Sequence, residues 1–296
     1  MALRRTDLAL EAHALYRATA HAADVDGLTL TERSRRGCGV TTVRVESADA
    51  SRVIGKPLGT YITLDLRALQ DDPAERTVCA AQALCDELRA LLGHEVRCAL
   101  VVGLGNRAMT PDVIGPLAAA HIPATRHLRQ HAFFAALTEV SVLTPGVLGT
   151  TGVEAVELVR GAAEAVHPEI VIAVDALASQ RLARVCTTIQ LTDTGIVPGS
   201  GVGNHRGALT RETLGVPVIG VGVPTVVDAA TLALDILSEA GADGLSPEAL
   251  RGHESVMVTP RDIDAQAREL SRIVGFGIGL ALQPSLSLDE LRALVE

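Results

Sequence analysis

Short apolar runs, continuous rather than alternating, constrain the fold of this 296-residue chain more than any other feature. A strand with one solvent-exposed face alternates apolar and polar residues, whereas a strand covered by helices on both faces is apolar throughout. Runs of the second kind predict strands at 61–66, 98–104, 170–176, 187–193 and 217–224. We therefore expect a sheet that is buried on both faces, with most of its strands parallel.

Longer segments with apolar residues at helical spacing separate these runs. They predict helices at about 74–92, 113–119, 152–166, 226–240 and 261–281. This alternation predicts the α/β class, as a three-layer α/β/α sandwich around a mainly parallel, mixed sheet. Because 48% of the residues are hydrophobic, the chain can bury one large core. We expect residues 1–296 to form a single domain, with a loop-like divide at about 241–258 before C-terminal helices.

Charge and cysteine pattern exclude several classes of function. The formal net charge of −9 argues against nucleic acid as a partner, because DNA binding relies on clustered Lys and Arg. The sequence has no stretch of about 18 apolar residues that would span a membrane, and its start has no long apolar signal segment. The five cysteines form no CxxC pair and no zinc-binding pattern. We expect a cytoplasmic protein without a membrane partner, a metal or another cofactor.

Three aspartates follow predicted strands, at the edge of the sheet where α/β proteins bind their ligands. Asp112 follows one strand across a short loop, whereas Asp175 and Asp193 close two others. Each also has a purely structural explanation, at a helix start for Asp112 and Asp175 and in a turn for Asp193. Together, carboxylates at one edge can share a proton, so that one serves as acid and another as base in peptide hydrolysis.

Two glycine-containing loops offer polar groups near these acids. The first holds Gly105 and Asn106, and the second holds Ser200, Gly201 and Asn204. Neither completes a nucleotide-binding fingerprint, because the first lacks a third glycine and the second lacks the Lys-Ser/Thr of a P-loop. We therefore expect these five residues to bind substrate through backbone N–H groups or to support the catalytic acids.

Other catalytic patterns are missing from the sequence. It has no HExxH zinc motif, no GxSxG nucleophile elbow and no recognisable cysteine nucleophile. Residues 193–195 read Asp-Thr-Gly, as in pepsin-like enzymes, but those enzymes need two such motifs in an all-β fold. Asp193 is therefore expected to bind substrate or to support the catalytic acids, and not to be catalytic itself.

Five segments carry a resemblance that covers nearly the whole chain. They are RTDLALEA at 5–12, VVGLGNRAMTPDVIGP at 101–116, PGVLGTTGVE at 145–154, VDALAS at 174–179 and the run at 192–228. In these segments the chain resembles the germination proteases of spore-forming bacteria. The resemblance implies an atypical aspartic endopeptidase of the spore core, a homo-oligomer (tetramer) without a cofactor, whose substrates are the small acid-soluble spore proteins. It also implies that Asp112 and Asp175, in the TPD and DALA segments, are the catalytic acids.

Two alternatives to this activity stay open. The same acids with a histidine could bind a divalent metal, as in the related hydrogenase-maturation peptidases. The chain could also bind spore proteins without cleaving them. Family members are typically made as inactive precursors with a short N-terminal extension, whereas only Met1–Arg4 precedes the first matched segment. We expect either that this extension is absent from the sequence or that zymogen control is replaced by another kind of regulation.

Overall fold

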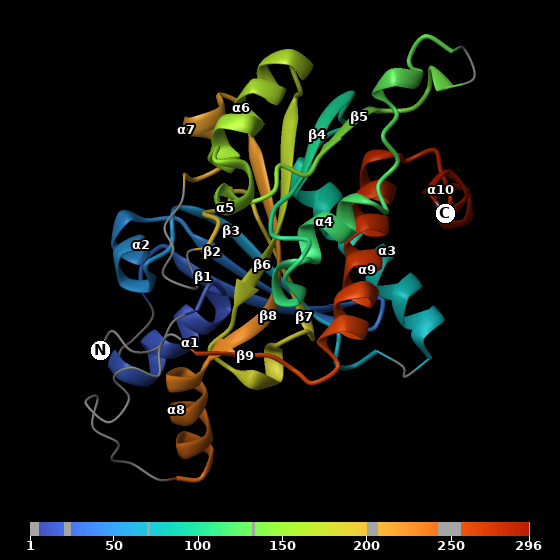
Figure 1. Cartoon of the computed structure of the whole chain (residues 1–296). Coiled ribbons are helices and arrows are strands. Elements are labelled where there is room, and N and C mark those ends of the chain that lie inside the picture. Colours follow the sequence, from blue (N-terminus) through green and yellow to red (C-terminus); the bar gives the residue numbers. More distant parts are fainter. Residues whose placement is uncertain are drawn as a thin grey trace.

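The computed structural model describes residues 6–20, 25–69, 72–131, 134–199, 207–241 and 256–295. Within these ranges, helices pack on both faces of one mixed, nine-stranded sheet (Figure 1). The strands lie in the order β1-β2-β3-β7-β8-β6-β4-β5, and β9 pairs with the end of β8. The α/β/α sandwich and the mixed sheet expected from the sequence are thereby confirmed.

The sheet consists of a parallel half and an antiparallel half that meet at β8. The parallel strands are β4 (Cys98–Gly103), β5 (Glu139–Leu143), β6 (Ile170–Ala178) and β8 (Val218–Asp228). The antiparallel strands are β1 (Leu28–Arg35), β2 (Cys38–Val45), β3 (Gly59–Asp65), β7 (Thr188–Thr192) and β9 (Met257–Val258). Parallel pairing is thus confined to one side of β8, and the expectation that most strands are parallel is wrong, because β1, β2, β3, β7 and β9 all pair antiparallel.

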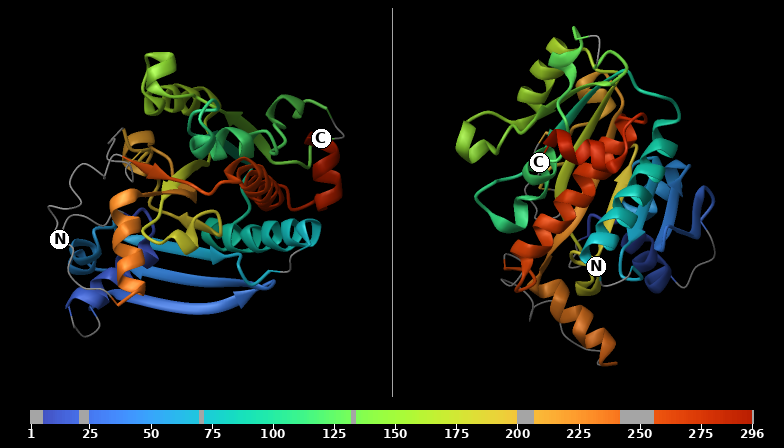
Figure 2. Two further views of the ribbon diagram at one scale, coloured as in Figure 1. Left: turned by 60° about the horizontal axis from the view of Figure 1, so that its bottom comes forward. Right: turned by 90° about the vertical axis from the view of Figure 1, so that its right-hand side faces the viewer.

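Helices cover the two faces of the sheet unequally, and Figure 2 shows the long α3 and α9 side by side on one of them. This face carries α3 (Pro73–Leu92), α4 (Ile114–Ala119) and α9 (Ile263–Leu282). The other face carries α1 (Ala9–Ala20), α2 (Ala48–Ile54) and α6 (Ala155–Val166). The remaining helices are η1 (Thr110–Asp112), η2 (Arg126–Leu128), α5 (Leu148–Thr151), η4 (Leu182–Arg184), α7 (Arg211–Leu214), α8 (Ala229–Glu239) and α10 (Leu288–Val295).

Strand β6 shows how the two-sided core positions the site. Ile172 and Val174 belong to the hydrophobic cluster on the side of α3 and α9, whereas Val171 and Ala173 belong to the cluster under α6. All four are fully buried, which explains why the run is apolar throughout. Because side chains alternate along a strand, Asp175 lies on the same face as Val171 and Ala173.

Several elements lie outside the sequence-based expectations, namely β1, β2, β5, α1, α2 and α10. Strand β1 reads LTLTERSR, and most of its residues are exposed, so it presents no apolar run. The loop-like divide expected at about 241–258 falls mostly on residues 242–255, which lie outside the described residues. The single-domain boundary therefore stays a prediction. Among the described helices, none is both long enough and apolar enough to cross a membrane.

Candidate active site

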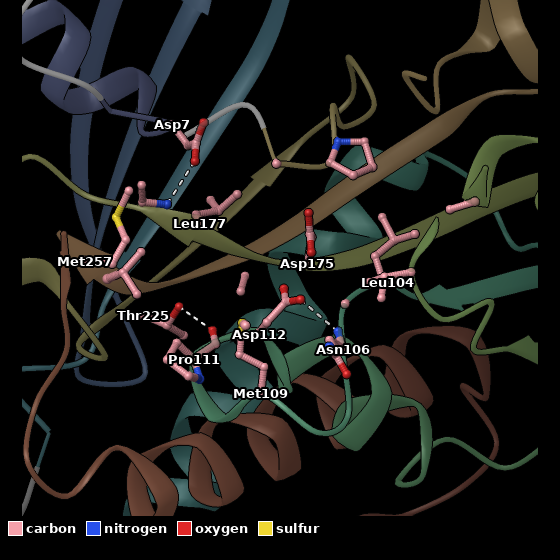
Figure 3. A pocket seen from close by; sticks show the side chains of 18 of the residues that line it. Asp7, Leu104, Asn106, Met109, Pro111, Asp112, Asp175, Leu177, Thr225 and Met257 are labelled. Atoms are coloured by element: carbon pink, nitrogen blue, oxygen red, sulfur yellow. Dashed lines mark hydrogen bonds between the residues drawn. The ribbon is translucent and has the colours of Figure 1, made fainter. Parts of the chain in front are cut away.

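A pocket of about 370 Å³ opens at the carboxyl end of β4, beside β6 (Figure 3). Its walls are largely apolar and include Leu104, Val147 and Leu177. Two acidic side chains from different elements, Asp112 and Asp175, also line it, and Figure 3 shows both of them in the pocket. Two of the three aspartates singled out from the sequence therefore share one site.

Asp175 lies within β6 rather than at its end, which corrects the sequence-based expectation. The strand continues to Ala178 because β6 goes on pairing with β8, with Asp175 opposite Gly222. On the other side, the last residue of β4 is Gly103, which pairs with Val174. Asp175 is thus the first β6 residue beyond the end of β4, where the pocket begins. The side chain is buried, with 4% exposed, and it caps no helix, since residues 176–178 are strand.

Asp112 ends the 3₁₀ helix η1, in the loop that leads from β4 to α4. Its Oδ2 atom accepts a hydrogen bond of 2.8 Å from the backbone N–H of Asn106. Helix α4 is capped by Val113, without a side-chain hydrogen bond, so the Asp112 carboxylate is not a helix cap. The carboxylate instead holds the start of its own loop, and it lines the pocket from that position.

Two glycines allow this loop to lie against the sheet. A Cβ atom on Gly115 would lie 2.6 Å from the backbone oxygen of Val174 on β6, which is too close for any side chain. Gly105 has a φ of +116°, and a Cβ there would overlap the backbone oxygen of Asp112. The start of α4 and the Asp112 loop can therefore approach β6 only with glycine at these positions.

Gly105 and Asn106 line the pocket, as expected. Of the two roles expected for them, substrate binding and support of the catalytic acids, the described contact belongs to the second, because the N–H of Asn106 is donated to Asp112. In the Asn106 side chain, the Oδ1 atom accepts from the N–H of Ala108 at 3.0 Å. The other predicted loop residues, Ser200, Gly201 and Asn204, lie outside the described residues.

Asp193 lies away from this pocket, contrary to the expectation that three acids meet at one edge. Strand β7 runs antiparallel to β8, whereas β6 runs parallel to it. The carboxyl end of β7 therefore lies on the side of the amino end of β6, away from the carboxyl end of β6 where the pocket is. The Asp193 Oδ1 atom accepts a 2.8 Å hydrogen bond from the N–H of Thr60 on β3. Asp193 is not among the described residues that line the pocket. A supporting role for it at the site stays a prediction that this position does not favour.

The N-terminal segment supplies a third acid to the pocket, which the sequence reasoning missed. Asp7 lines the pocket, and its Oδ2 accepts a 2.8 Å hydrogen bond from the N–H of Ala178, at the end of β6. Asp7 also donates its own N–H to the Ala178 carbonyl at 3.0 Å. The signal for it was the RTDLALEA segment, which resembles the family without indicating a role for any of its residues.

Glu11 and Lys56 fasten the same segment. The Glu11 side chain, 2% exposed, accepts from the backbone N–H groups of Gln180 at 2.6 Å and Arg181 at 3.1 Å. The Lys56 ammonium donates to the Asp7 carbonyl at 2.9 Å. Desolvation lowers the pKa of Lys56, although the nearby acids oppose this shift. The segment is therefore bound to the pocket wall through charged groups that are removed from water.

Metal binding would require several ligands within reach of one ion. In the part of the chain that the structure describes, no group of three or more His, Cys, Asp or Glu side chains is close enough to hold a metal ion. The acids that line the pocket are Asp7, Asp112 and Asp175; Asp7 accepts the N–H of Ala178, and Asp112 accepts the N–H of Asn106. The described pocket is thus lined by three carboxylates, on separate elements, within largely apolar walls.

Comparisons with known proteins agree on one family. The family model described as germination protease matches residues 3–240. Germination proteases of Caldanaerobacter subterraneus subsp. tengcongensis and Clostridium perfringens are 39% and 36% identical, covering 98% and 97% of this chain and the same shares of the relatives. One from Bacillus cereus is 40% identical over 79% of this chain and 65% of the relative.

A solved [NiFe] hydrogenase maturation protease from Thermococcus kodakarensis is similar over 66% of this chain and 98% of its own, with 18% identity and a TM-score of 0.37. A likeness of this degree carries no weight for the fold or for the chemistry of the site. The germination proteases above do show the family, because they match at more than 30% identity over most of both chains. This chain belongs to the germination protease family.

Proposed function

We propose that this chain is an endopeptidase that hydrolyses small acid-soluble spore proteins during germination, with Asp112 and Asp175 as an acid/base pair that activates water. One observation carries the proposal, namely that two carboxylates from separate elements line a single, largely apolar pocket in a germination protease. The proposed setting is the cytoplasm of the spore core, and the proposed assembly is a homo-tetramer. Both follow from the family resemblance.

The surroundings of the two acids support different roles for them. Asp112 is only partly buried, and its carboxylate accepts the N–H of Asn106, which favours the ionised form of a carboxyl group. Asp175 is 4% exposed, and burial disfavours ionisation. Asp112 is therefore proposed as the base and Asp175 as the acid. Two like charges in a low-dielectric pocket disfavour each other, so a single shared proton is the expected state of the pair.

The proposed reaction proceeds in two steps. A water molecule gives a proton to the Asp112 carboxylate as its oxygen attacks the scissile carbonyl, while the Asp175 carboxyl group donates a hydrogen bond to the carbonyl oxygen. The tetrahedral intermediate then collapses, the C–N bond breaks, and the amine leaves with a proton from the acid pair. Leu104 and Leu177 limit the access of other water molecules, which strengthens these interactions.

The test is cleavage of a purified small acid-soluble spore protein by the wild type and by Asp112→Asn, Asp175→Asn and Asp193→Asn, with and without a chelator. General acid–base catalysis contributes roughly 10²–10⁴-fold, so the first two variants should lose about that much turnover. Asp193→Asn is the matched control, because its carboxylate bonds Thr60 outside the pocket, and it should keep the wild-type rate. Circular dichroism must show that every variant is folded.

Other outcomes would point to the two alternatives. Loss of wild-type cleavage on addition of the chelator would make the acids metal ligands. Binding of intact substrate without cleavage by the wild type would indicate a binding protein. Full activity of Asp112→Asn or Asp175→Asn would contradict the acid/base pair.

A further inference from the structure

Strand β8 contains one extra residue beside the pocket. Leu177 of β6 pairs with Pro224 of β8, but the next β6 residue, Ala178, pairs with Val226. Thr225 therefore has no partner on β6, and the strand is bulged at this point. Bulges are concentrated next to active sites, where they redirect a side chain or end the pairing. This one lies in the pocket wall, because Thr225 and Val226 both line the pocket.

The side chain of Thr225 reaches from the sheet to the loop that carries Asp112. Its Oγ1 donates a 2.6 Å hydrogen bond to the carbonyl of Pro111, drawn as a dashed line in Figure 3. Thr225 is 1% exposed, so water does not compete for this bond. The backbone oxygen of Thr225 in turn accepts from Oγ1 of Thr259 at 2.9 Å, which holds the bulge from its other side.

Other described hydrogen bonds tie the loop to its surroundings at its two ends, where the N–H of Leu104 donates to the Val174 carbonyl and the hydroxyl of Ser271 donates to the Ile114 carbonyl. Pro111 has no N–H group, so its carbonyl is the only hydrogen-bonding group that this residue can offer. The bonds from Asn106 to Asp112 and from Asp112 to Met109 both lie within the loop, and they fix its shape rather than its place on the sheet. Met109 is 56% exposed and gives little packing. Thr225 is thus a direct tie between the residue before Asp112 and the sheet that carries Asp175.

We propose that Thr225 is a positioning residue, which holds Asp112 at its working distance from Asp175 through the Pro111 carbonyl. The inference rests on the proposed function of the two acids. The hydroxyl of Thr225 is donated to Pro111 rather than to either acid, and it contributes no proton to the reaction. Removal of this hydroxyl should let the loop drift, and a displacement of about 1 Å in a catalytic group can cost about 10²-fold in rate. Substrate binding by the apolar walls should change little.

The experiment compares Thr225→Val, which keeps the shape and removes the hydroxyl, with Thr225→Ser, which keeps the hydroxyl. We expect kcat to fall roughly 10- to 100-fold in Thr225→Val with KM within about threefold of the wild type, and Thr225→Ser to recover most of the activity. The matched control is Thr138→Val, since the 9% exposed Thr138 also donates its hydroxyl to a carbonyl, that of Val96, at 2.9 Å. It should lower the melting temperature without changing kcat.

Thr225→Ala is measured beside Thr225→Val, because it introduces no new atoms and remains informative if the valine variant does not fold. Wild-type kcat in either folded variant would overturn the inference, as would an equal loss of kcat in Thr138→Val. Asp112→Asn distinguishes failure of the positioning role of Thr225 from failure of the proposed function of the two acids. If it is inactive while Thr225→Val is normal, only the positioning role fails, whereas full activity of Asp112→Asn removes the proposed function itself.

Discussion

Gly105→Ala should inactivate the enzyme by displacing Asp112. Gly105 has a φ of +116°, which residues other than glycine rarely adopt. An added Cβ would overlap the Asp112 backbone oxygen and lie 3.0 Å from its Oδ1. Because real Cβ atoms essentially never lie within 3.0 Å of another heavy atom, and this one would lie 2.1 Å from the Asp112 backbone oxygen, the Asp112 loop has to move by roughly 1 Å. For the catalytic role proposed for Asp112, a shift of this size corresponds to a loss of about 10²-fold in kcat.

The same substitution should also destabilise the protein, and a control separates the two effects. Backbone strain of this kind costs about 1–3 kcal/mol. Gly93, at the end of α3, has a φ of +73°, and a Cβ added there would meet no atom within 4 Å, so Gly93→Ala adds strain without overlap. Gly93→Ala should cost about 1–2 kcal/mol and leave kcat unchanged. Thermal unfolding would report each loss as a melting temperature lower by about 2–4 °C per kcal/mol.

The assay is the initial rate of spore-protein cleavage over a range of substrate concentrations, corrected for the folded fraction. Gly105→Ala should lose kcat, whereas Gly93→Ala should lose only stability. A Gly105→Ala variant that is folded and keeps the wild-type kcat would refute the reasoning, because Asp112 would then tolerate the displacement. A similar fall of kcat in Gly93→Ala would also refute it, since the effect would then be general.

Three further predictions concern buried groups. Glu11→Gln should cost about 1.5–3 kcal/mol in urea unfolding, because its charged oxygens accept the N–H of Gln180; an unchanged midpoint would contradict this. Burial raises the pKa of Cys186 from 9.0 to about 12. Above pH 9 the thiol therefore ionises in the unfolded chain before it does in the folded one, so the free energy of unfolding of the wild type should fall as the pH rises. The fall should be smaller in Cys186→Ala, which has no thiol at this position. Gln283→Leu should cost about 1–3 kcal/mol while kcat stays unchanged, because the buried N–H of Thr138 loses its partner and the Thr138 carbonyl keeps only the Thr125 hydroxyl; calorimetry and kinetics together check it.

Three strands of the parallel half, β4, β6 and β8, were predictable, because local pattern encodes them, whereas β5 was not. Residues of β4, β6 and β8 are buried on both faces, so each strand reads as a continuous apolar run. Strand β1 was not predictable in this way, since its LTLTERSR sequence is largely exposed and its position depends on pairing with β2. Where a strand is stabilised mainly by its neighbour, its own residues carry little signal.

Two aspartates show where sequence reasoning about the site ends. Asp193 was grouped with the others because it closes an apolar run, but the direction of β7 depends on its pairing with β3 and β8. Asp175 was placed at a strand end, whereas pairing with β8 extends β6 past it to Ala178. The direction and the length of a strand are set by the strands with which it pairs, and neither can be predicted from its own apolar run.

Long-range contacts explain the residues that were missed altogether. Asp7 meets Ala178 across 171 positions of the sequence, and Thr225 meets Pro111 across 114. Thr225 lies inside an apolar run, where a threonine is an ordinary strand residue. Only the folded chain identifies the carbonyl that its hydroxyl binds.

The most direct test of the central claim is the rate of spore-protein cleavage by Asp112→Asn, by Asp175→Asn and by the double variant, measured side by side. Residues that act as one unit have strongly non-additive effects, because loss of either partner removes the function of both. An acid/base pair therefore predicts that the double variant is as slow as the slower single variant, within about threefold. A double variant whose loss equals the product of the two single losses would contradict the shared mechanism, and wild-type turnover in either single variant would exclude it.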